Sequence, residues 1–301
     1  MLRAATVRAR ARSPAVPPLR HYALPAAAPE PVLLSSEKHA APSSSSEAPV
    51  IVLHGLFGSK QNWRSLAKGM AQRLERDIIT LDLRNHGQSP HRRECSYEDL
   101  AADVQAFIEQ EEKLSDCVVV GHSMGGKVAM ALALGGCEAV SKLVVVDISP
   151  AVGKVSPEFQ AYINAMHQIQ DAKLQSRKEA DDLLQETEPD LSVRQFLLTN
   201  LDRASPSDPY HFRIPLPFLQ NAIDEIGAFP YTPGERVYEK PSLFLKGSKS
   251  KYINSRNIPV IKQFFPNARL ETLDAGHWVH AERPKEFIEL LDDFCKSSSS
   301  S

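Results

Sequence analysis

The chain has 301 residues and a mass of 33.3 kDa, which is enough for one large hydrophobic core with a small insertion. Its formal net charge of −2 gives no reason to expect binding to nucleic acid or to an anionic membrane. The four cysteines lack the CxxC spacing of metal sites, and no apolar run approaches the roughly 20 residues of a membrane-spanning helix. We therefore expect reduced thiols, no metal, no cofactor and no transmembrane segment.

The first 24 residues differ in composition from the rest of the chain. Every charged residue among them is an arginine, and the first acidic residue of the chain is Glu30. This composition is typical of a mitochondrial transit peptide and predicts a mitochondrial matrix protein; a basic tail without a targeting role is the alternative. Pro, Ala and Ser dominate residues 25–48, which predicts a linker with at most one edge strand near Val32–Ser35. The serine run at 297–301 predicts a disordered tail.

Between residues 49 and 150, short apolar runs alternate with amphipathic segments. The apolar runs predict buried strands at 50–53, 78–81, 118–120 and 143–146. The helical pattern predicts helices at 63–74, 97–110 and 127–134. Because strands that alternate with helices form parallel sheets covered on both faces, we predict an α/β domain over residues 49–296.

The alternation stops between residues 151 and 236 and resumes after them. Helices are expected at 157–170, 176–186 and 193–201, followed by an irregular proline-rich stretch at 206–217. Several large side chains of this region line a substrate pocket or fill the core of the insertion: Phe159, Tyr162, Met166, Phe196, Phe212 and Phe218. Strands at 242–246 and 269–273, and a closing helix from Pro284 to Phe294, complete the domain.

A serine follows the strand at 118–120 in a sharp turn flanked by glycines. Gly121-His122-Ser123-Met124-Gly125 fits the pattern Gly-x-Ser-x-Gly, and a helix follows it, which is the context of a nucleophile elbow. Amides at the start of that helix favour negative charge beside the serine. Ser123 is the candidate nucleophile, and an incidental serine in a strand-to-helix turn is the alternative. The stretch resembles the α/β-hydrolase superfamily, which implies that the insertion at 151–236 is a lid.

The resemblance directs the search for a base and an acid to the ends of later strands. Gly276-His277, on the loop after the last strand, matches the catalytic histidine of the superfamily. Many members carry the acid after the strand at 242–246, but Ser250 stands there, so the role falls to Asp147 after the strand at 143–146. A helix-capping role is the alternative for Asp147, and Asp274 is a second carboxylate that could orient His277.

The turn His54-Gly55-Leu56 follows the first strand of the domain. In α/β-hydrolases a His-Gly turn at this point supplies one backbone amide of the oxyanion hole. Two donors are needed because the tetrahedral intermediate concentrates charge on one oxygen. The resemblance implies the amides of Leu56 and Met124, with Phe57 as the second choice after Leu56. We expect His54 to stabilise the turn rather than to act as a base.

Several motifs together resemble one family, that of abhydrolase domain-containing protein 11, which includes bacterial esterases and fungal mitochondrial ethanol acetyltransferases. They are His54–Lys60, Asp82–Pro90, Val120–Lys127, Val146–Pro150, Arg194–Asn200 and Gly276–His280. The resemblance implies a mitochondrial serine hydrolase that acts on small-molecule carboxylic esters or thioesters through an acyl-enzyme. An alcohol O-acetyltransferase that uses acetyl-CoA and ethanol shares this acyl-enzyme and is the first alternative. A non-catalytic hydrolase-like binding protein is the second, and protein partners and oligomeric state stay open.

Overall fold

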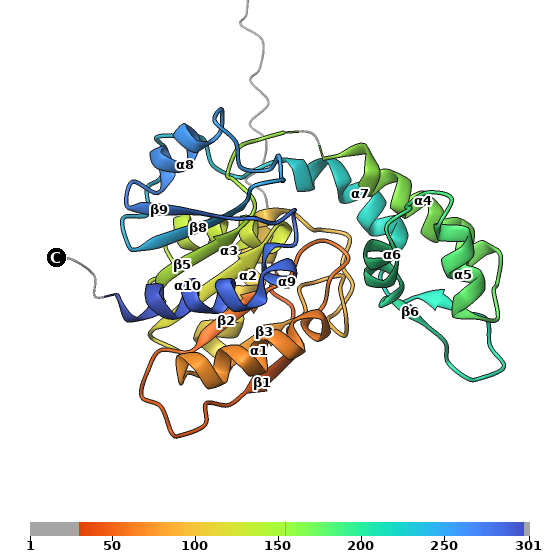
Figure 1. The fold of residues 1–301 in the computed structure, drawn as a ribbon, viewed down its shortest axis with the longest axis horizontal. Helices are drawn as coiled ribbons and strands as arrows, with labels where there is room; N and C mark the ends of the chain where they lie inside the picture. The colour runs from red at the N-terminus through yellow and green to blue at the C-terminus, as the bar shows by residue number, and fades with distance from the viewer. Residues whose placement is uncertain (1–29, 154, 298–301) are drawn as a thin grey trace, which may run out of the picture.

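A seven-stranded sheet forms the centre of the computed structural model, in the strand order β1-β3-β2-β4-β5-β8-β9 (Figure 1). The structure describes residues 30–153 and 155–297, so the predicted transit peptide at 1–24 lies outside the described residues. Only the β1–β3 pair is antiparallel among the pairs of this sheet, which confirms the predicted mostly parallel α/β architecture. The strands are β1 (Ser36–His39), β2 (Val50–Leu53), β3 (Ile78–Leu81), β4 (Cys117–His122), β5 (Val140–Val146), β8 (Ser242–Gly247) and β9 (Ala268–Leu273).

Helices cover both faces of the sheet because its strands carry apolar side chains on both sides. In β5, Val145 belongs to the core beneath α3, whereas Val144 belongs to the opposite core with Trp63 and Phe287. One face carries α1 (Lys60–Leu74) and α10 (Pro284–Lys296). The other carries α2 (Tyr97–Ala106) with its π-helical continuation η1 (Phe107–Glu111), α3 (Met124–Leu134) and α8 (Ile258–Phe264).

The edge strand begins later than the sequence predicted. It was expected near Val32–Ser35, but β1 pairs with β3 only from Ser36 to His39. Val32 and Leu34 are buried, and the Val32 amide donates to Asp103 Oδ1 (2.8 Å), so this stretch packs its side chains without joining the ladder. Residues 32–39 are therefore part of the folded domain, and the one edge strand allowed within 25–48 lies at Ser36–His39 instead of near Val32–Ser35.

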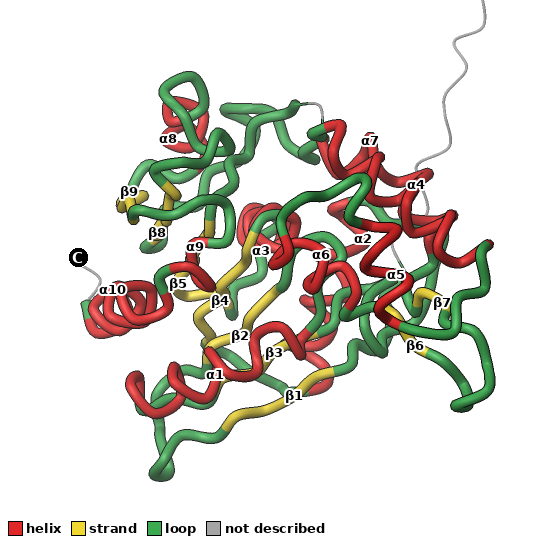
Figure 2. Tube along the Cα trace, turned by 45° about the vertical axis from the view of Figure 1, so that its right-hand side comes forward, coloured by secondary structure: helices red, strands yellow, loops and turns green. Residues whose placement is uncertain are grey.

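Residues 151–236 form a helical insertion between β5 and β8. Its helices gather at one end of the sheet in two views (Figures 1 and 2). The three predicted helices are present with shifted ends, but α7 and a short hairpin were not predicted. Pro215 precedes α7 and Pro217 lies in its first turn, where proline is tolerated, so these prolines start a helix. The elements are α4 (Pro157–Asp171), α5 (Arg177–Leu184), α6 (Leu191–Leu198), β6 (Leu201–Asp202), β7 (His211–Phe212) and α7 (Leu216–Gly227).

Two further properties concern the helices and the cysteines of the domain. Across the described ranges, none of the helices is both long and apolar enough to span a membrane. The cysteines Cys95, Cys117, Cys137 and Cys295 are all buried and free, as expected for reduced thiols.

Candidate active site

Ser123 lies in a sharp turn between β4 and α3. Its backbone adopts φ 52° and ψ −118°, a strained conformation for a residue with a side chain. The flanking glycines make this turn possible, because a Cβ at Gly121 would lie 2.2 Å from Gly125 O, and one at Gly125 would lie 2.5 Å from His54 O. The Ser123 amide donates to Val146 O (3.0 Å), which fixes the turn against β5. The predicted elbow geometry is therefore present at Ser123.

Asp147 follows β5 and contacts His277. Its carboxylate is fully buried, and Oδ2 lies 2.8 Å from His277 Nδ1, inside the hydrogen-bond range. The second oxygen, Oδ1, accepts from the Gly247 amide at the end of β8 (3.0 Å). Because the carboxylate accepts the proton on Nδ1, Nε2 is the ring nitrogen left for exchange with a substrate or with Ser123.

The other carboxylate considered for His277 lies elsewhere. Asp274 is on the surface, with 65% of its side chain exposed, and its Oδ1 lies 3.0 Å from Lys249 Nζ. Its second oxygen pairs with Arg283. These cations hold the pKa of Asp274 below its usual value, first through Lys249. Asp274 therefore braces the loop that leads to His277 and does not contact the His277 ring.

Ser123 and His277 line two adjacent cavities. The lysine-lined cavity, of about 650 Å³, extends from them past Lys127, Lys249 and Lys251. The aromatic cavity, of about 730 Å³, extends past Phe57, Trp63, Tyr162, Phe196 and Trp278. Leu56, Glu158, Phe159 and Tyr252 line both cavities. The two cavities therefore meet at the candidate nucleophile and base.

The six large side chains that the sequence proposed for a pocket lie in three different surroundings. Phe159, Tyr162 and Phe196 line the aromatic cavity. Met166 and Phe212 are buried in the apolar core. Phe218 lies outside both cavities, with its ring 5.9 Å from the Arg93 guanidinium. Half of the set therefore forms the wall that the insertion contributes.

Backbone amides near Ser123 are free to bind an oxyanion. Met124 is the first residue of α3, a position whose amide has no acceptor within the helix. Within the described part of the chain, the Leu56 amide has no acceptor, and both residues line the lysine-lined cavity. The second choice, Phe57, donates its amide to His86 Nε2 (3.2 Å), so it is occupied. The geometry favours Leu56 over Phe57.

Two buried histidines hold the loops beside the elbow. His54 Nε2 accepts from the Leu83 amide (3.0 Å) and Nδ1 donates to Gly55 O (2.8 Å), which confirms the predicted turn-stabilising role. His86 uses both ring nitrogens in the same way, with Nδ1 donating to Arg84 O (2.9 Å). Burial lowers the pKa of His54 and lowers that of His86 to about 3, so both rings are neutral at physiological pH.

One further histidine, His122, contacts His277 and a second, His280, lies behind it; the sequence analysis gave neither a role at the site. His122 Nε2 donates to His277 O (3.0 Å), and the two ring centroids lie 4.7 Å apart. Behind it, His280 lies 4.5 Å from the His122 ring and stacks on Trp63 at 4.1 Å. Burial lowers the pKa of His122 and lowers that of His280 to about 3. No local pattern signals this stack, because His122 and His277 lie 155 residues apart.

The chain leaving the insertion is attached to α3 and α2, and the chain entering it is attached to the leaving chain, at one place, which we call the hinge contact. Lys127 Nζ donates to Gly227 O (3.0 Å) and Ala228 O (2.7 Å), and Tyr97 Oη donates to Ile226 O (2.8 Å). The Gly153 amide donates to Gly227 O (3.0 Å), which joins the chain entering the insertion to the chain leaving it. Burial lowers the pKa of Lys127 to about 8. The hinge contact therefore holds the insertion one helical turn from Ser123.

The chain resembles known proteins over most of its length. A model of the alpha/beta hydrolase fold matches residues 48–284. The chain is 42% identical over 251 residues to the "sn-1-specific diacylglycerol lipase ABHD11" of Danio rerio, covering 82% of this chain and 78% of that protein. It is 41% identical over 261 residues to a "probable alcohol acetyltransferase" of Saccharomyces cerevisiae, covering 82% and 76%. A solved "marine microorganism esterase" has a TM-score of 0.81 and 35% identity, covering 87% of this chain and 99% of that one.

The described residues contain no cluster of the side chains that commonly bind metal ions. Between residues 30 and 297, Lys154 apart, no three His, Cys, Asp or Glu side chains are grouped so that they could hold a metal ion.

Proposed function

Because this chain belongs to the α/β-hydrolase fold family and is an enzyme of the serine hydrolase and esterase type, we propose that it hydrolyses carboxylic esters or thioesters through an acyl-enzyme on Ser123. His277 is the general base in this proposal, and Asp147 orients it. The observation that carries the proposal is the 2.8 Å contact between Asp147 Oδ2 and His277 Nδ1, on a histidine that lines the same cavities as Ser123.

In the first half of the reaction, Ser123 Oγ attacks the carbonyl carbon while His277 Nε2 takes its proton. The buried carboxylate of Asp147 stabilises the imidazolium that forms and holds the ring in one tautomer. The amides of Leu56 and Met124 bind the developing oxyanion. When the intermediate collapses, the alcohol or thiol leaves with the proton from His277.

In the second half, water attacks the acyl-enzyme and His277 takes a proton from the water. The acid leaves after the proton returns to Ser123 Oγ. Because an alcohol can replace water at this step, the same residues support transfer of the acyl group to an alcohol. The relative named as a probable alcohol acetyltransferase favours this second candidate function.

Labelling and kinetics test the nucleophile and the base. A fluorophosphonate probe should label the wild-type protein and not Ser123→Ala, whereas Ser255→Ala, which changes an exposed serine outside both cavities, should label normally. Ser123→Ala and His277→Ala should each lower kcat on p-nitrophenyl butyrate by about 10⁴–10⁶-fold, with little further loss in the double variant, because the two act as a unit. Labelling of Ser123→Ala, or additive losses, would contradict the assignment.

Product analysis separates the two candidate functions. Wild-type protein is given acetyl-CoA with and without ethanol, and acetate and ethyl acetate are quantified by gas chromatography. Hydrolysis predicts acetate as the main product at all ethanol concentrations. A rise of ethyl acetate above acetate with increasing ethanol would favour the acetyltransferase.

We also propose that residues 1–24 direct import into mitochondria and are removed. The support is their composition, in which the charged residues are all arginines. Mass spectrometry of the protein from purified mitochondria should find a mature N-terminus near residue 25. A terminus at Met1 would contradict this.

A further inference from the structure

The two cavities that meet at Ser123 differ in charge. Besides the shared Glu158, the charged side chains that line the lysine-lined cavity are Lys127, Lys249 and Lys251. The aromatic cavity has Asp190 and Glu282 in addition to Glu158 and, among the described residues that line it, no lysine or arginine. A substrate whose ester group lies at Ser123 therefore meets cations on one side and carboxylates on the other.

One lysine of the lysine-lined cavity is available to a ligand. Lys127 Nζ is bonded to the carbonyl oxygens of the hinge contact. Lys249 Nζ forms an ion pair with Asp274 Oδ1, at a distance of 3.0 Å. Lys251 is exposed, and within the described ranges its ammonium group has no acceptor. Among the described residues that line this cavity, Lys251 is therefore the lysine whose ammonium group has no protein partner.

The loop that carries Lys251 is held beside the catalytic centre. The next residue, Tyr252, stacks on the His277 ring with centroids 4.2 Å apart. Asn257 Nδ2 donates to Tyr252 O (2.7 Å) and Asn254 Nδ2 donates to Lys251 O (2.9 Å), so side chains of the loop fix its backbone. Because the carboxylate that contacts His277 comes from β5, this loop after β8 is free to line the cavity.

The aromatic cavity disfavours an anion. Its carboxylates are held in place, because Asp190 Oδ1 accepts from the Ser192 amide (2.7 Å) and Glu282 Oε2 accepts from the Gly276 amide (2.8 Å). Its remaining wall is largely aromatic, which suits an uncharged apolar group. An anion placed there would meet like charges and no compensating cation.

We propose that the enzyme sorts the two halves of its substrate by charge: a half that carries a carboxylate or a phosphate occupies the lysine-lined cavity, with Lys251 as the selecting residue, and an uncharged apolar half occupies the aromatic cavity. This inference rests on the proposed hydrolysis at Ser123. It names the substrate class as esters or thioesters with one anionic half. Lys251 is a specificity residue and takes no part in proton transfer.

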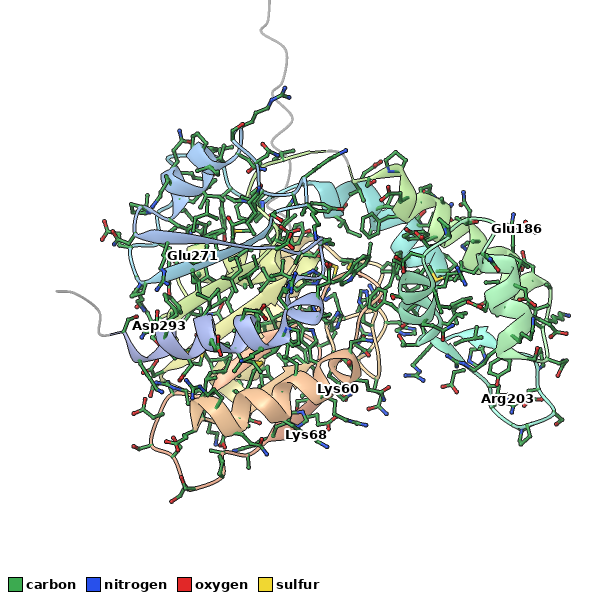
Figure 3. All side chains as sticks on the ribbon, in the orientation of Figure 1. Lys60, Lys68, Glu186, Arg203, Glu271 and Asp293 are labelled. Carbon is green, nitrogen blue, oxygen red and sulfur yellow. The ribbon has the colours of Figure 1, made fainter. Side chains whose placement is uncertain are left out.

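Matched ester pairs test the inference on the wild-type enzyme and on Lys251→Glu. With the anion on the leaving group, 4-(butyryloxy)benzoate and 4-(butyryloxy)phenyl phosphate are compared with neutral 4-(butyryloxy)benzamide. With the anion on the acyl half, p-nitrophenyl hemiadipate is compared with the corresponding adipamide ester. The measured quantity is the ratio of kcat/KM for the anionic ester to that for its neutral partner. The control is Lys68→Glu, which makes the same charge change at an exposed lysine of α1 outside both cavities (Figure 3).

The wild-type ratio should exceed one for at least one anionic ester, and Lys251→Glu should lower that ratio about tenfold at low salt. Lys68→Glu should leave it within about twofold, and 1 M NaCl should reduce the wild-type preference, because salt screens exposed charges. Comparing the benzoate ester with the phosphate ester shows whether the cavity prefers a carboxylate or a phosphate. Comparing both with the adipate ester shows whether the preferred anion lies on the leaving group or on the acyl half. Ratios that Lys251→Glu leaves unchanged for all three anions, with the neutral esters still hydrolysed, would overturn the inference and leave the proposed function standing.

A binding measurement keeps the inference testable if no ester is turned over. Calorimetry of Ser123→Ala with 4-hydroxyphenyl phosphate, 4-hydroxybenzoate and neutral 4-hydroxybenzamide does not depend on catalysis. Tighter binding of an anion than of the amide, lost on adding Lys251→Glu, supports the inference. Equal binding of all three compounds overturns it.

Discussion

The sheet end that carries Ser123, Asp147 and His277 and the helical insertion that walls the aromatic cavity hold their residues in place by different means. At the sheet end the backbone itself is constrained: Ser123 and Asp147 both have positive φ, and a Cβ at Gly121 would lie 2.2 Å from Gly125 O. In the insertion, helices pack through side chains, and a Cβ added at Gly153 would meet no atom within 4 Å. The sheet end therefore leaves no room for a side chain at Gly121, whereas the room in the insertion depends on position: Gly153 is open, but a Cβ at Gly227 would lie 2.2 Å from Gly153 O.

This difference matches the two tasks that we assign to the regions. Acyl transfer requires the reacting groups to be held within a fraction of an ångström, which strands and tight turns provide. Selection among substrates requires walls of suitable shape and charge, and these can be changed without moving the reacting groups. The following predictions test that division, from the largest expected effect to the smallest.

Asp147→Asn should lower kcat about 10⁴-fold with little change in the melting temperature, because the amide would favour the wrong His277 tautomer and supply no charge to the imidazolium. Steady-state kinetics on p-nitrophenyl butyrate and a thermal melt measure both quantities. The matched control is Asp274→Asn, on the surface pair with Lys249, which should change kcat less than threefold. If the two variants lost activity equally, the assignment of the acid would be wrong.

Gly121→Ala should lower the free energy of unfolding by more than about 3 kcal/mol, because the new Cβ cannot be accommodated without moving the elbow. Gly153→Ala, in open space within the insertion, should change it by less than about 1 kcal/mol. Urea denaturation of both variants gives the comparison directly. Similar losses at the two positions would remove the distinction between the packed turn at Gly121 and the open position at Gly153.

The hinge contact makes stability depend on pH through Lys127. Burial lowers its pKa from 10.5 to about 8, so between these pH values the unfolded chain binds more protons than the folded chain. The contribution of Lys127 to stability therefore increases as the pH rises through this window. Relative to Lys127→Met, the wild-type protein should gain about 2 kcal/mol between pH 7.5 and 9.5, measured by chemical denaturation. The difference in unfolding free energy between wild type and Lys68→Met should not change in this way. If the difference between wild type and Lys127→Met stayed constant with pH, the lowered pKa of Lys127 would be refuted.

His122→Phe should lower kcat about tenfold at nearly constant KM, because the ring would no longer donate to His277 O and the His277 loop would lose a fixed contact. His122→Gln keeps a donor and should restore most of kcat. This rescue separates a positioning role from simple packing, since phenylalanine fills the volume better than glutamine. Equal kcat values for the two variants would assign His122 to packing alone.

The parts of the fold and site that were predictable are those encoded by neighbouring residues. The apolar runs of β2 to β5 and the Gly-x-Ser-x-Gly turn are local, so the parallel sheet and the elbow at Ser123 were foreseen. Asp147 was predicted as the acid because Ser250, not a carboxylate, follows β8. The distance between Asp147 Oδ2 and His277 Nδ1 is within the expected hydrogen-bond range. The start of β1 was not predicted, since the bond from the Val32 amide to Asp103 spans 71 residues.

What could not be predicted depends on contacts between distant segments. The stack from His277 through His122 and His280 to Trp63 joins four separate elements or loops of the fold. The opposite charges of the two cavities likewise arise from residues that come together only in three dimensions. α7 was missed for a different reason: its prolines are compatible with a first helical turn, and proline alone does not tell a helix start from an irregular loop.

The hydrogen bond between the Gly153 amide and Gly227 O has a consequence for the engineering of this enzyme. Because Gly153 and Gly227 are hydrogen-bonded to each other, the chain between them, which includes α4 to α7, begins and ends at adjacent points. A turn of a few residues would connect the same two points, with little added loop-closure entropy and no change in strand register. We therefore expect that the insertion can be exchanged for another one while Ser123, Asp147 and His277 keep their positions on the sheet.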